Sequence, residues 1–272
     1  MASLADLQAK AKVVRRHIIT STTRAGSGHP TSSMSAVEIA VALYFGNVLR
    51  HDPKNPAWPE RDKFILSKGH AAPLLYAVLA EAGYFPTEQL ATLRQIGSPL
   101  EGHPNMRRLP GVEASTGSLG QGLSIGVGAA LAARLDRSPA RVYVLTGDGE
   151  IAEGQVWEAM MSAAKYRLDN LCAIVDQNGY QQTGATAEVL DLRPLVPRLE
   201  AFGWFAQEID GHDLHAVLAA FKKAQETKDR PSAIVARTVK GYPIQKLLAS
   251  DPNHHGKPLT KDEAEQALAM LA

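Results

Sequence analysis

Two oxygen-bearing side chains stand where buried strands are predicted to end. Asp148 follows the apolar run 142–145, and Asn178 follows the apolar run 171–175. Ligands bind at the carboxyl ends of parallel strands, so both side chains are expected at one edge of a sheet. Their oxygens suit Mg²⁺ or Ca²⁺, and the glycines beside them let backbone amides approach a diphosphate. The pair predicts a metal–diphosphate clamp, with the carbonyl of Tyr180 as a third protein ligand; the alternative is two unrelated turns.

Four histidines lie in loops next to glycine or proline, a setting that predicts one convergent site. Imidazole suits proton transfer near neutral pH and hydrogen bonding to hydroxyls or phosphate oxygens. These four residues are His29, His70, His103 and His255. The other five histidines lack this context and are predicted to be surface residues: His17, His51, His212, His215 and His254.

Three further features permit both a structural and a functional interpretation. The glycine-rich loop 116–122 opens a predicted helix, as loops that cradle phosphates often do. Glu153 and Glu158 lie near the start of the helix after Asp148, where they complement the helix dipole or serve a subunit interface. Cys172, the single cysteine, falls in a predicted core strand and is expected to act as a small buried apolar residue.

The elements that must hold these residues alternate between strand and helix. That alternation favours an α/β fold, a doubly wound, mostly parallel sheet with helices on both faces, in one domain over residues 1–272. Short apolar runs predict strands at 64–66, 141–146, 171–176, 204–209 and 232–238. Helices are predicted at 4–24, 36–49, 73–82, 119–135, 153–166, 192–202, 213–227 and 261–271, with Ser35 as the cap of the second. Glycines 120, 122, 126 and 128 are expected to allow close packing against another backbone.

The composition excludes several classes of protein. The chain has 272 residues, 45% of them hydrophobic, which is enough for a sizeable core. A net charge of +1 gives no field that would attract nucleic acid or an anionic membrane. No apolar run reaches the length of a membrane span, and the first 16 residues lack the apolar block of a secretory signal. A cytoplasmic protein is therefore expected.

Taken together, the motifs resemble the N-terminal, thiamine diphosphate-binding half of transketolase. The Asp148-to-Asn178 signature is common to thiamine diphosphate enzymes, whereas the Gly-His-Pro elements and the 116–122 loop are more specific to transketolases. The matching segments run in the family's order over about residues 15–258: 27–30, 67–70, 102–104, 116–122, 147–149 with 178, and 255–257.

The resemblance implies a role for each matching residue. Asp148, Asn178 and the carbonyl of Tyr180 would hold the metal. His70, Gly149 and His255 would contact the cofactor diphosphate, and Gly117 and Leu119 would meet the aminopyrimidine through their main chains. His29, His103 and His255 would surround the reacting carbon and the sugar hydroxyls, and Glu153 and Glu158 would lie at the subunit interface.

The resemblance also implies a partner, because transketolases are more than twice this length. The chain looks like the N-terminal subunit of a split transketolase, which needs a separate C-terminal subunit; the two would form a heterotetramer with two copies of each chain. Such an enzyme transfers a two-carbon ketol unit from a ketose phosphate to an aldose. Thr31-Ser32 replaces the family's glycine, and Pro243 falls within 242–254, a stretch without the family's usual Gly and Trp pattern. These departures leave both a pentose phosphate and a branched or sulfonated sugar open.

Two other interpretations stay open at this stage, besides that of a transketolase subunit. The first is the alpha subunit of a 2-oxo acid dehydrogenase, which carries a related metal signature but lacks the Gly-His-Pro loops. The second is a non-catalytic subunit for cofactor binding or assembly. Intact candidate metal ligands and loop histidines favour a working site over this second alternative.

Overall fold

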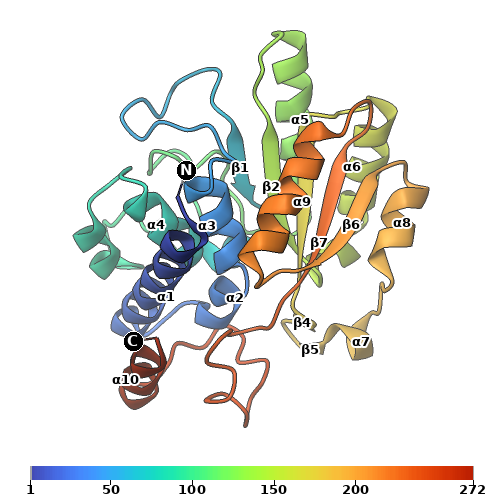
Figure 1. The fold of residues 1–272 in the computed structure, drawn as a ribbon. Helices are drawn as coiled ribbons and strands as arrows, with labels where there is room; N and C mark the ends of the chain where they lie inside the picture. The colour runs from blue at the N-terminus through green and yellow to red at the C-terminus, as the bar shows by residue number, and fades with distance from the viewer. Residues whose placement is uncertain (1, 272) are drawn as a thin grey trace.

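The computed structural model describes residues 2–271, and its centre is a five-stranded parallel sheet in the order β1-β2-β3-β7-β6 (Figure 1). The strands are β1 (Lys63–Leu66), β2 (Val142–Gly147), β3 (Leu171–Gln177), β6 (Phe205–Asp210) and β7 (Ser232–Arg237). A two-stranded antiparallel hairpin, β4 (Tyr180–Gln181) and β5 (Gly184–Ala185), follows β3 directly. The α/β fold class is confirmed, while the single domain over 1–272 stays a prediction that includes two residues outside the described range.

Helices cover both faces of the sheet, as Figure 1 shows. They are α1 (Leu4–Ala25), α2 (Pro30–Met34), α3 (Val37–Phe45), α4 (Ala72–Glu81), α5 (Gln121–Leu135), α6 (Gly154–Lys165), α7 (Thr186–Val189), α8 (Leu195–Ala201), α9 (Leu214–Glu226) and α10 (Lys261–Met270). Capping boxes fix the starts of two helices, because in each the two side chains accept from each other's backbone amides. The pair is Ser3 and Asp6 in α1, and Thr260 and Glu263 in α10.

Alternate side chains of each central strand enter opposite cores. Tyr143 and Leu145 of β2 pack in the core shared with α1, α3, α4 and α9, whereas Val142 and Val144 pack in the core shared with α5, α6 and α8. A strand buried on both faces needs apolar residues at every position, which explains the continuous runs in the sequence. Cys172 lies in β3 and is 5% exposed, so its predicted role as a buried apolar residue is confirmed.

Several local predictions were wrong, each for a physical reason. Ser35 does not cap α3, because its hydroxyl donates to the Asp176 carboxylate 2.6 Å away. Gly122 does pack closely, since a Cβ there would lie 2.7 Å from the Ser67 Cα, but a Cβ on Gly128 would meet nothing within 4 Å. Gly126 leaves room for a Val144 side chain rather than a backbone. The sequence analysis also did not anticipate α2, the β4–β5 hairpin or α7.

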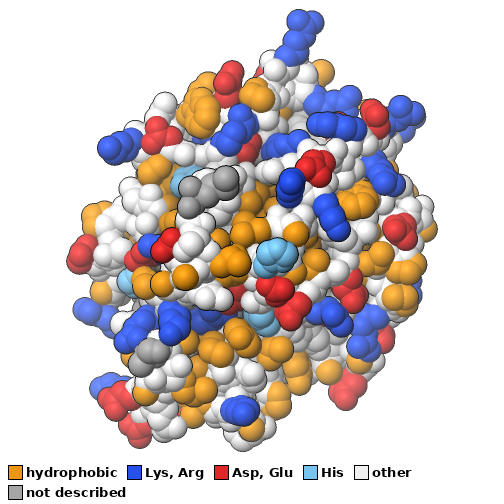
Figure 2. Space-filling view, viewed as in Figure 1, with side chains coloured by type: hydrophobic (Ala, Val, Ile, Leu, Met, Phe, Trp, Pro, Cys, Tyr) orange, Lys and Arg blue, Asp and Glu red, His pale blue; other side chains and the backbone are white. Residues whose placement is uncertain are grey.

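The described surface mixes positive and negative side chains. On the face drawn in Figure 2, Lys and Arg alternate with Asp and Glu, in keeping with the net charge of +1. None of the helices within residues 2–271 combines the length and apolarity needed to cross a membrane.

Candidate active site

Asp148 and Asn178 lie side by side at the carboxyl ends of β2 and β3. The Asp148 carboxylate accepts hydrogen bonds from the backbone amides of Gly149 (3.0 Å) and Gly179 (2.7 Å), so it contacts the residue next to Asn178. The Asn178 amide nitrogen donates to Asp176 (3.0 Å), and its Oδ1 accepts from the Tyr180 amide (3.1 Å). These two bonds fix which end of the amide is oxygen, and hence which end can bind a cation.

One cavity of about 750 Å³ collects every residue predicted for the site. That volume lies within the range of ordinary cofactor pockets, about 300–1,000 Å³. The predicted residues that line it are His29, His70, His103, Gly117, Leu119, Asp148, Gly149, Asn178, Tyr180 and His255. The structure therefore brings the whole set together, and the role of each residue stays a prediction.

Three of the four loop histidines form a compact ring. The ring centroids of His29, His70 and His255 lie 5.0 to 5.2 Å apart. Burial, followed by nearby cations and neighbouring imidazoles, lowers the pKa of His29 to about 4 and that of His70 to about 2. Burial and then Lys240 lower the pKa of His255 to about 4. All three imidazoles are therefore neutral at pH 7, and the buried His29 Nδ1 has no hydrogen-bond partner among the described residues.

His103 belongs to the Gly-His-Pro segment 102–104, and its ring packs against the glycine-rich loop 116–122. A Cβ on Gly117 would lie 3.0 Å from the His103 ring, and Gly117 has a φ of +146°, so both space and backbone conformation require glycine there. Burial and then Arg94 lower the pKa of His103. The Glu150 carboxylate ties this loop to the end of β2, because it accepts from the amides of Gly120 in the loop and Gly147 in the strand, both at 3.0 Å.

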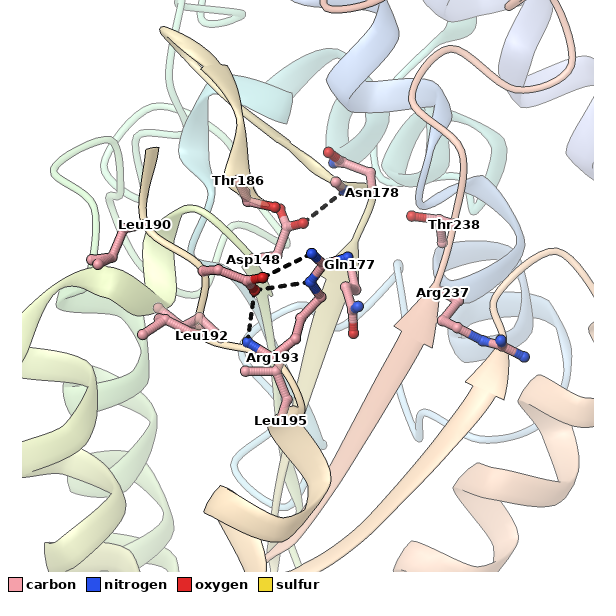
Figure 3. A pocket seen from close by; sticks show the side chains of 13 residues that line it. Asp148, Gln177, Asn178, Thr186, Leu190, Leu192, Arg193, Leu195, Arg237 and Thr238 are labelled. Atoms are coloured by element: carbon pink, nitrogen blue, oxygen red, sulfur yellow. Dashed lines mark hydrogen bonds and ion pairs between the residues drawn. The ribbon is translucent and has the colours of Figure 1, made fainter. Parts of the chain in front are cut away.

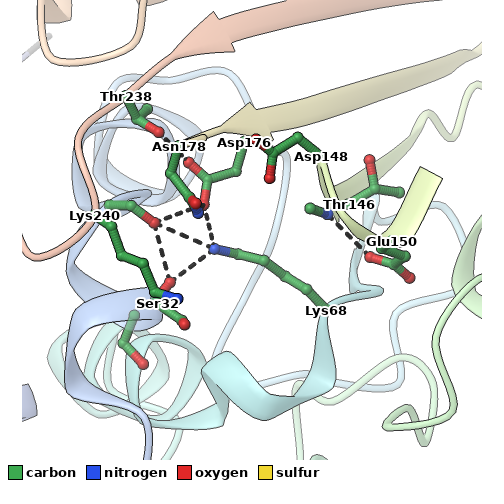
Figure 4. Close-up of polar contacts among 12 residues, drawn as sticks. Ser32, Lys68, Thr146, Asp148, Glu150, Asp176, Asn178, Thr238 and Lys240 are labelled. Carbon is green, nitrogen blue, oxygen red and sulfur yellow. Dashed lines mark hydrogen bonds and ion pairs between the residues drawn. The ribbon is translucent and has the colours of Figure 1, made fainter. Parts of the chain in front are cut away.

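A buried ion pair between Lys68 and Asp176 supports the clamp (Figure 4). The Asp176 carboxylate, which has no exposed surface, also accepts from Ser35, Thr238 and Asn178. The sequence suggested no role for Lys68, which lies in the matching segment 67–70, or for Asp176, which ends the predicted strand 171–176. Their spacing of 108 residues gave no signal that they pair.

Lys240 also contacts the candidate site, and no sequence pattern pointed to it. Its Nζ donates to Asn253 Oδ1 (2.6 Å) and to His255 Nδ1 (3.0 Å). Because an ammonium only donates, the neutral His255 ring must carry its proton on Nε2. Burial and then Lys68 lower the pKa of Lys240 to about 8.

Two histidines predicted to be surface residues are largely buried. His254 is 9% exposed, and its carbonyl accepts from the Thr31 hydroxyl at 3.1 Å. The His212 side chain is 10% exposed and contacts Glu38. Both predictions used the local sequence context, whereas both histidines contact residues more than 170 positions away in the sequence.

A second cavity of about 260 Å³ is lined by two of the candidate metal ligands, Asp148 and Asn178 (Figure 3). Arg193, which is ion-paired with Asp191 at 2.8 Å, and Arg237 line this cavity as well. Asp148 and Asn178 therefore lie between two hollows, so a cation bound there would leave room for non-protein ligands around it.

The electrostatics around Asp148 suit a bound divalent cation. Burial, then the neighbouring Asp176 charge, raises the pKa of Asp148 to about 7, and no Lys or Arg within residues 2–271 forms an ion pair with it. In the same range, no three or more His, Cys, Asp or Glu side chains lie close enough together to hold a metal ion by themselves. A set of one carboxylate, one amide oxygen and one carbonyl suits Mg²⁺ when phosphate and water complete its octahedron.

Comparison with known proteins identifies the family. The model of the family described as "Transketolase, thiamine diphosphate binding domain" matches residues 7–271. The chain belongs to the transketolase family. It is 47% identical over 98% of its length to a 6-deoxy-6-sulfo-D-fructose transketolase subunit from Clostridium sp. (strain MSTE9), and covers 96% of that subunit. It is 43% identical to one of the subunits of apulose-4-phosphate transketolase from Actinobacillus succinogenes, again covering 96% of it.

Longer transketolases match over the same region. The chain is 45% identical to human transketolase over 98% of its own length but spans 42% of the human protein. A solved transketolase from Leishmania mexicana superimposes with a TM-score of 0.91 at 31% identity, over 100% of this chain and 41% of that one. The transketolase chain thus corresponds to the N-terminal subunit of a split family member, and the 2-oxo acid dehydrogenase alternative has no support.

Proposed function

We propose that this transketolase subunit supplies the metal- and diphosphate-binding half of a two-chain enzyme that moves a two-carbon ketol unit from a ketose to an aldose. One observation carries the proposal. Asp148 and Asn178 adjoin at neighbouring strand ends, on the wall of the same cavity that holds the ring of three histidines.

The residues around the cavity fit thiamine diphosphate and a divalent cation. Asp148, Asn178 and the Tyr180 carbonyl would hold Mg²⁺ or Ca²⁺; Gly149, His70 and His255 would contact the diphosphate; and the main chains of Gly117 and Leu119 would meet the aminopyrimidine. When bound, the cofactor supplies an electron sink while the carbon–carbon bond of the ketose breaks. The remaining tasks fall to side chains of this chain and its partner.

The histidines would handle protons at the sugar oxygens. Because the pKa values of His29 and His255 lie at about 4, both rings are neutral at pH 7 and each has one nitrogen free of a proton. Lys240 holds the His255 proton on Nε2, so this atom would donate to a sugar hydroxyl. His29 and the exposed His103 both line the cavity and would provide further contacts.

We further propose that the working assembly contains a second copy of this chain and two C-terminal transketolase subunits, in a cytoplasmic heterotetramer. Each C-terminal subunit would supply the parts of longer transketolases that this chain does not span. The exposed side of α5 and α6 suits contact between copies, because Ile125 and Met161 are 41% and 54% exposed there. Glu153 and Glu158 are exposed at the start of α6, beside this surface.

The donor is proposed to be a ketose with an anionic end, either a phosphate or a sulfonate. The two subunit relatives named above belong to transketolases for a sulfonated hexose and for apulose 4-phosphate. An ordinary pentose phosphate belongs in the same chemical class. Donor choice would depend largely on the C-terminal subunit, which would hold the anionic end.

The decisive experiment combines this subunit with its C-terminal partner, thiamine diphosphate and Mg²⁺. Donors to compare are a pentulose phosphate, a branched ketose phosphate, a 6-sulfonated ketose and a 2-oxo acid. Each is offered with the same aldose acceptor, and the readout is formation of the ketose that is two carbons longer than this acceptor. At least one ketose should react, and the 2-oxo acid should not. Absence of product from every ketose, in a complex shown to assemble and to bind cofactor, would favour the non-catalytic alternative.

The clamp is tested separately by calorimetric titration of the cofactor. Asp148→Ala should abolish Mg²⁺-dependent binding in the assembled complex. Asp262→Ala, which removes an exposed carboxylate of α10, is the matched control and should bind like the unchanged protein. Equal cofactor affinity in Asp148→Ala and the control would rule out the clamp.

A further inference from the structure

The segment that follows β7 carries Lys240 into the candidate site. Lys240 is buried and reaches His255, whereas the Val239 side chain before it is 42% exposed. Gly241 has a φ of +75° and donates its amide to the Thr31 carbonyl (3.1 Å). Tyr242 in turn donates its amide to the Val239 carbonyl (3.1 Å), so residues 239–242 form a tight turn.

The outward side of this turn is bonded to a cluster of Arg15, Glu38 and His212. His212 Nε2 accepts from the Val239 amide (2.9 Å), and the His212 ring stacks on Tyr242 with centroids 3.9 Å apart. Arg15 Nε donates to the Tyr242 carbonyl at 3.0 Å. Both ends of the turn are therefore held by side chains from elsewhere in the fold.

Glu38 sets the state of the His212 ring. Since Nε2 accepts from a backbone amide, the ring proton must be on Nδ1, where it donates to Glu38 Oε2 (3.0 Å). Glu38 is 5% exposed and is also bonded by Arg15 through two contacts of 2.6 and 2.7 Å. Burial raises the pKa of Glu38, but the bonds from His212 and Arg15 outweigh it and keep the carboxyl ionised.

We propose that Glu38 and His212 are positioning residues for the transfer reaction, acting through Lys240 on His255. The contacts run without a gap from Glu38 to His212, to the Val239 amide, along the turn to Lys240 and finally to His255 Nδ1. Without the His212 acceptor, the Val239 amide would lose its hydrogen bond and residues 239–242 would become more mobile. The Lys240 ammonium would then shift away from His255 Nδ1, and the His255 proton would no longer be confined to Nε2. This inference rests on the proposed function, because it assigns the cluster a task in that reaction.

A second cluster of the same composition provides a matched control. Lys10 and His17 of α1 both contact Glu81 of α4, at 2.7 and 2.8 Å. This cluster thus joins a cation, a glutamate and a histidine in the same way. Neither His17 nor Glu81 lines the candidate site. A purely structural role predicts similar consequences when either histidine is replaced.

The experiment compares His212→Phe with His17→Phe in the assembled two-chain enzyme. His212→Phe keeps a ring against Tyr242 but removes the acceptor for the Val239 amide. It should lower kcat/KM about 10-fold, a typical cost of losing an outer partner of a functional histidine. His17→Phe should stay within about 2-fold, as expected away from functional residues. His212→Gln, whose amide oxygen replaces Nε2 as acceptor, should recover most of the loss.

A double-variant cycle with Lys240→Met tests the route of the effect. If His212 acts through Lys240, then adding His212→Phe to Lys240→Met should cost nothing further. Hydrogen exchange at residues 238–242 should also be faster in His212→Phe than in the unchanged protein. Full additivity, or equal losses in His212→Phe and His17→Phe, would overturn the inference.

The two proposals fail in different ways. An unchanged complex that converts no ketose contradicts the proposed function, whatever the variants do. An active complex in which His212→Phe folds, keeps normal exchange at 238–242 and turns over normally contradicts only the positioning role. Thermal unfolding of each variant identifies any that fail to fold. If His212→Phe does, the smaller His212→Leu, which also removes the acceptor, replaces it, and the same loss of kcat/KM and faster exchange are expected.

Discussion

Asp148 and Asp176 stand at the ends of neighbouring strands, yet their surroundings are opposite. They are so close that the Asp148 amide donates to the Asp176 carbonyl at 3.2 Å. Asp176 receives an ammonium, two hydroxyls and an amide from the chain. Burial raises its pKa, but Lys68 and these donors outweigh burial and lower it overall. Among residues 2–271, only two backbone amides donate to the Asp148 carboxylate, and its pKa rises to about 7.

This difference in partners suggests that the Asp176 carboxylate is structural, whereas the Asp148 carboxylate suits a ligand. Buried charges are stable when they are paired and hydrogen-bonded. Asp176 meets that condition within the chain and uses its position to orient Asn178. Asp148 has no cationic partner among the described residues, and it lines two cavities from which a cation and a diphosphate could arrive.

The largest expected effect comes from removing the cation of the internal pair. Lys68→Met leaves the Asp176 carboxylate buried without its ammonium, which should lower the free energy of unfolding by about 3–5 kcal/mol. Urea unfolding of the metal-free protein measures the change. Adding Asp176→Asn to Lys68→Met removes the uncompensated charge and should restore part of the loss. A loss below about 1 kcal/mol in the single variant would mean that water or another group replaces the lysine.

The sequence predicted one member of this comparison and not the other. Asp148 was recognisable because a carboxylate beside glycines, after an apolar run, is a local pattern. Asp176 lies just two residues before Asn178 but inside the strand, where its role depends on Lys68 and Ser35, which come from distant elements. The same reason explains Ser35, whose local context predicted a helix cap, and His212, whose context predicted a surface residue.

The strands and most helices were predictable because their sequence signals, unlike those of Asp176 and His212, are local. Their apolar patterns are local, and burial on both faces of the sheet makes those patterns continuous in β2 and β3. The convergence of four histidines was also predictable, because all four loops carry glycine or proline beside the ring. Which nitrogen of each ring carries the proton depends on distant donors such as Lys240, and no local pattern encodes it.

A smaller effect is expected from the pH dependence of Asp148 in the metal-free protein. Its pKa is about 7 in the folded chain and 3.8 ordinarily, so the folded state keeps a proton that the unfolded state loses. Stability should therefore fall as pH rises from about 4 to about 7, by about 3 kcal/mol in total. Asp148→Asn should lack this part of the pH dependence and be more stable than the unchanged protein at pH 8.

Urea unfolding of both proteins from pH 4 to 8 gives the measurement. Taking the difference between them cancels the titration of the buried histidines, which both proteins share. Adding Mg²⁺ at pH 8 should stabilise the unchanged protein and leave Asp148→Asn unaffected. A pH-independent difference between the two proteins would show that the Asp148 carboxylate is as well compensated as that of Asp176.

The smallest expected effect compares two buried serines near α2. Ser35 donates to the Asp176 carboxylate at 2.6 Å, whereas Ser33 donates to the neutral His29 carbonyl at 2.8 Å. Hydrogen bonds to charged groups contribute about 1.5–3 kcal/mol and those to neutral groups about 0.5–1.5 kcal/mol. Ser35→Ala should thus cost about 1 kcal/mol more unfolding free energy than Ser33→Ala. Equal costs would mean that Lys68 alone neutralises Asp176, and that the hydroxyl only fills space beside a carboxylate that is already satisfied.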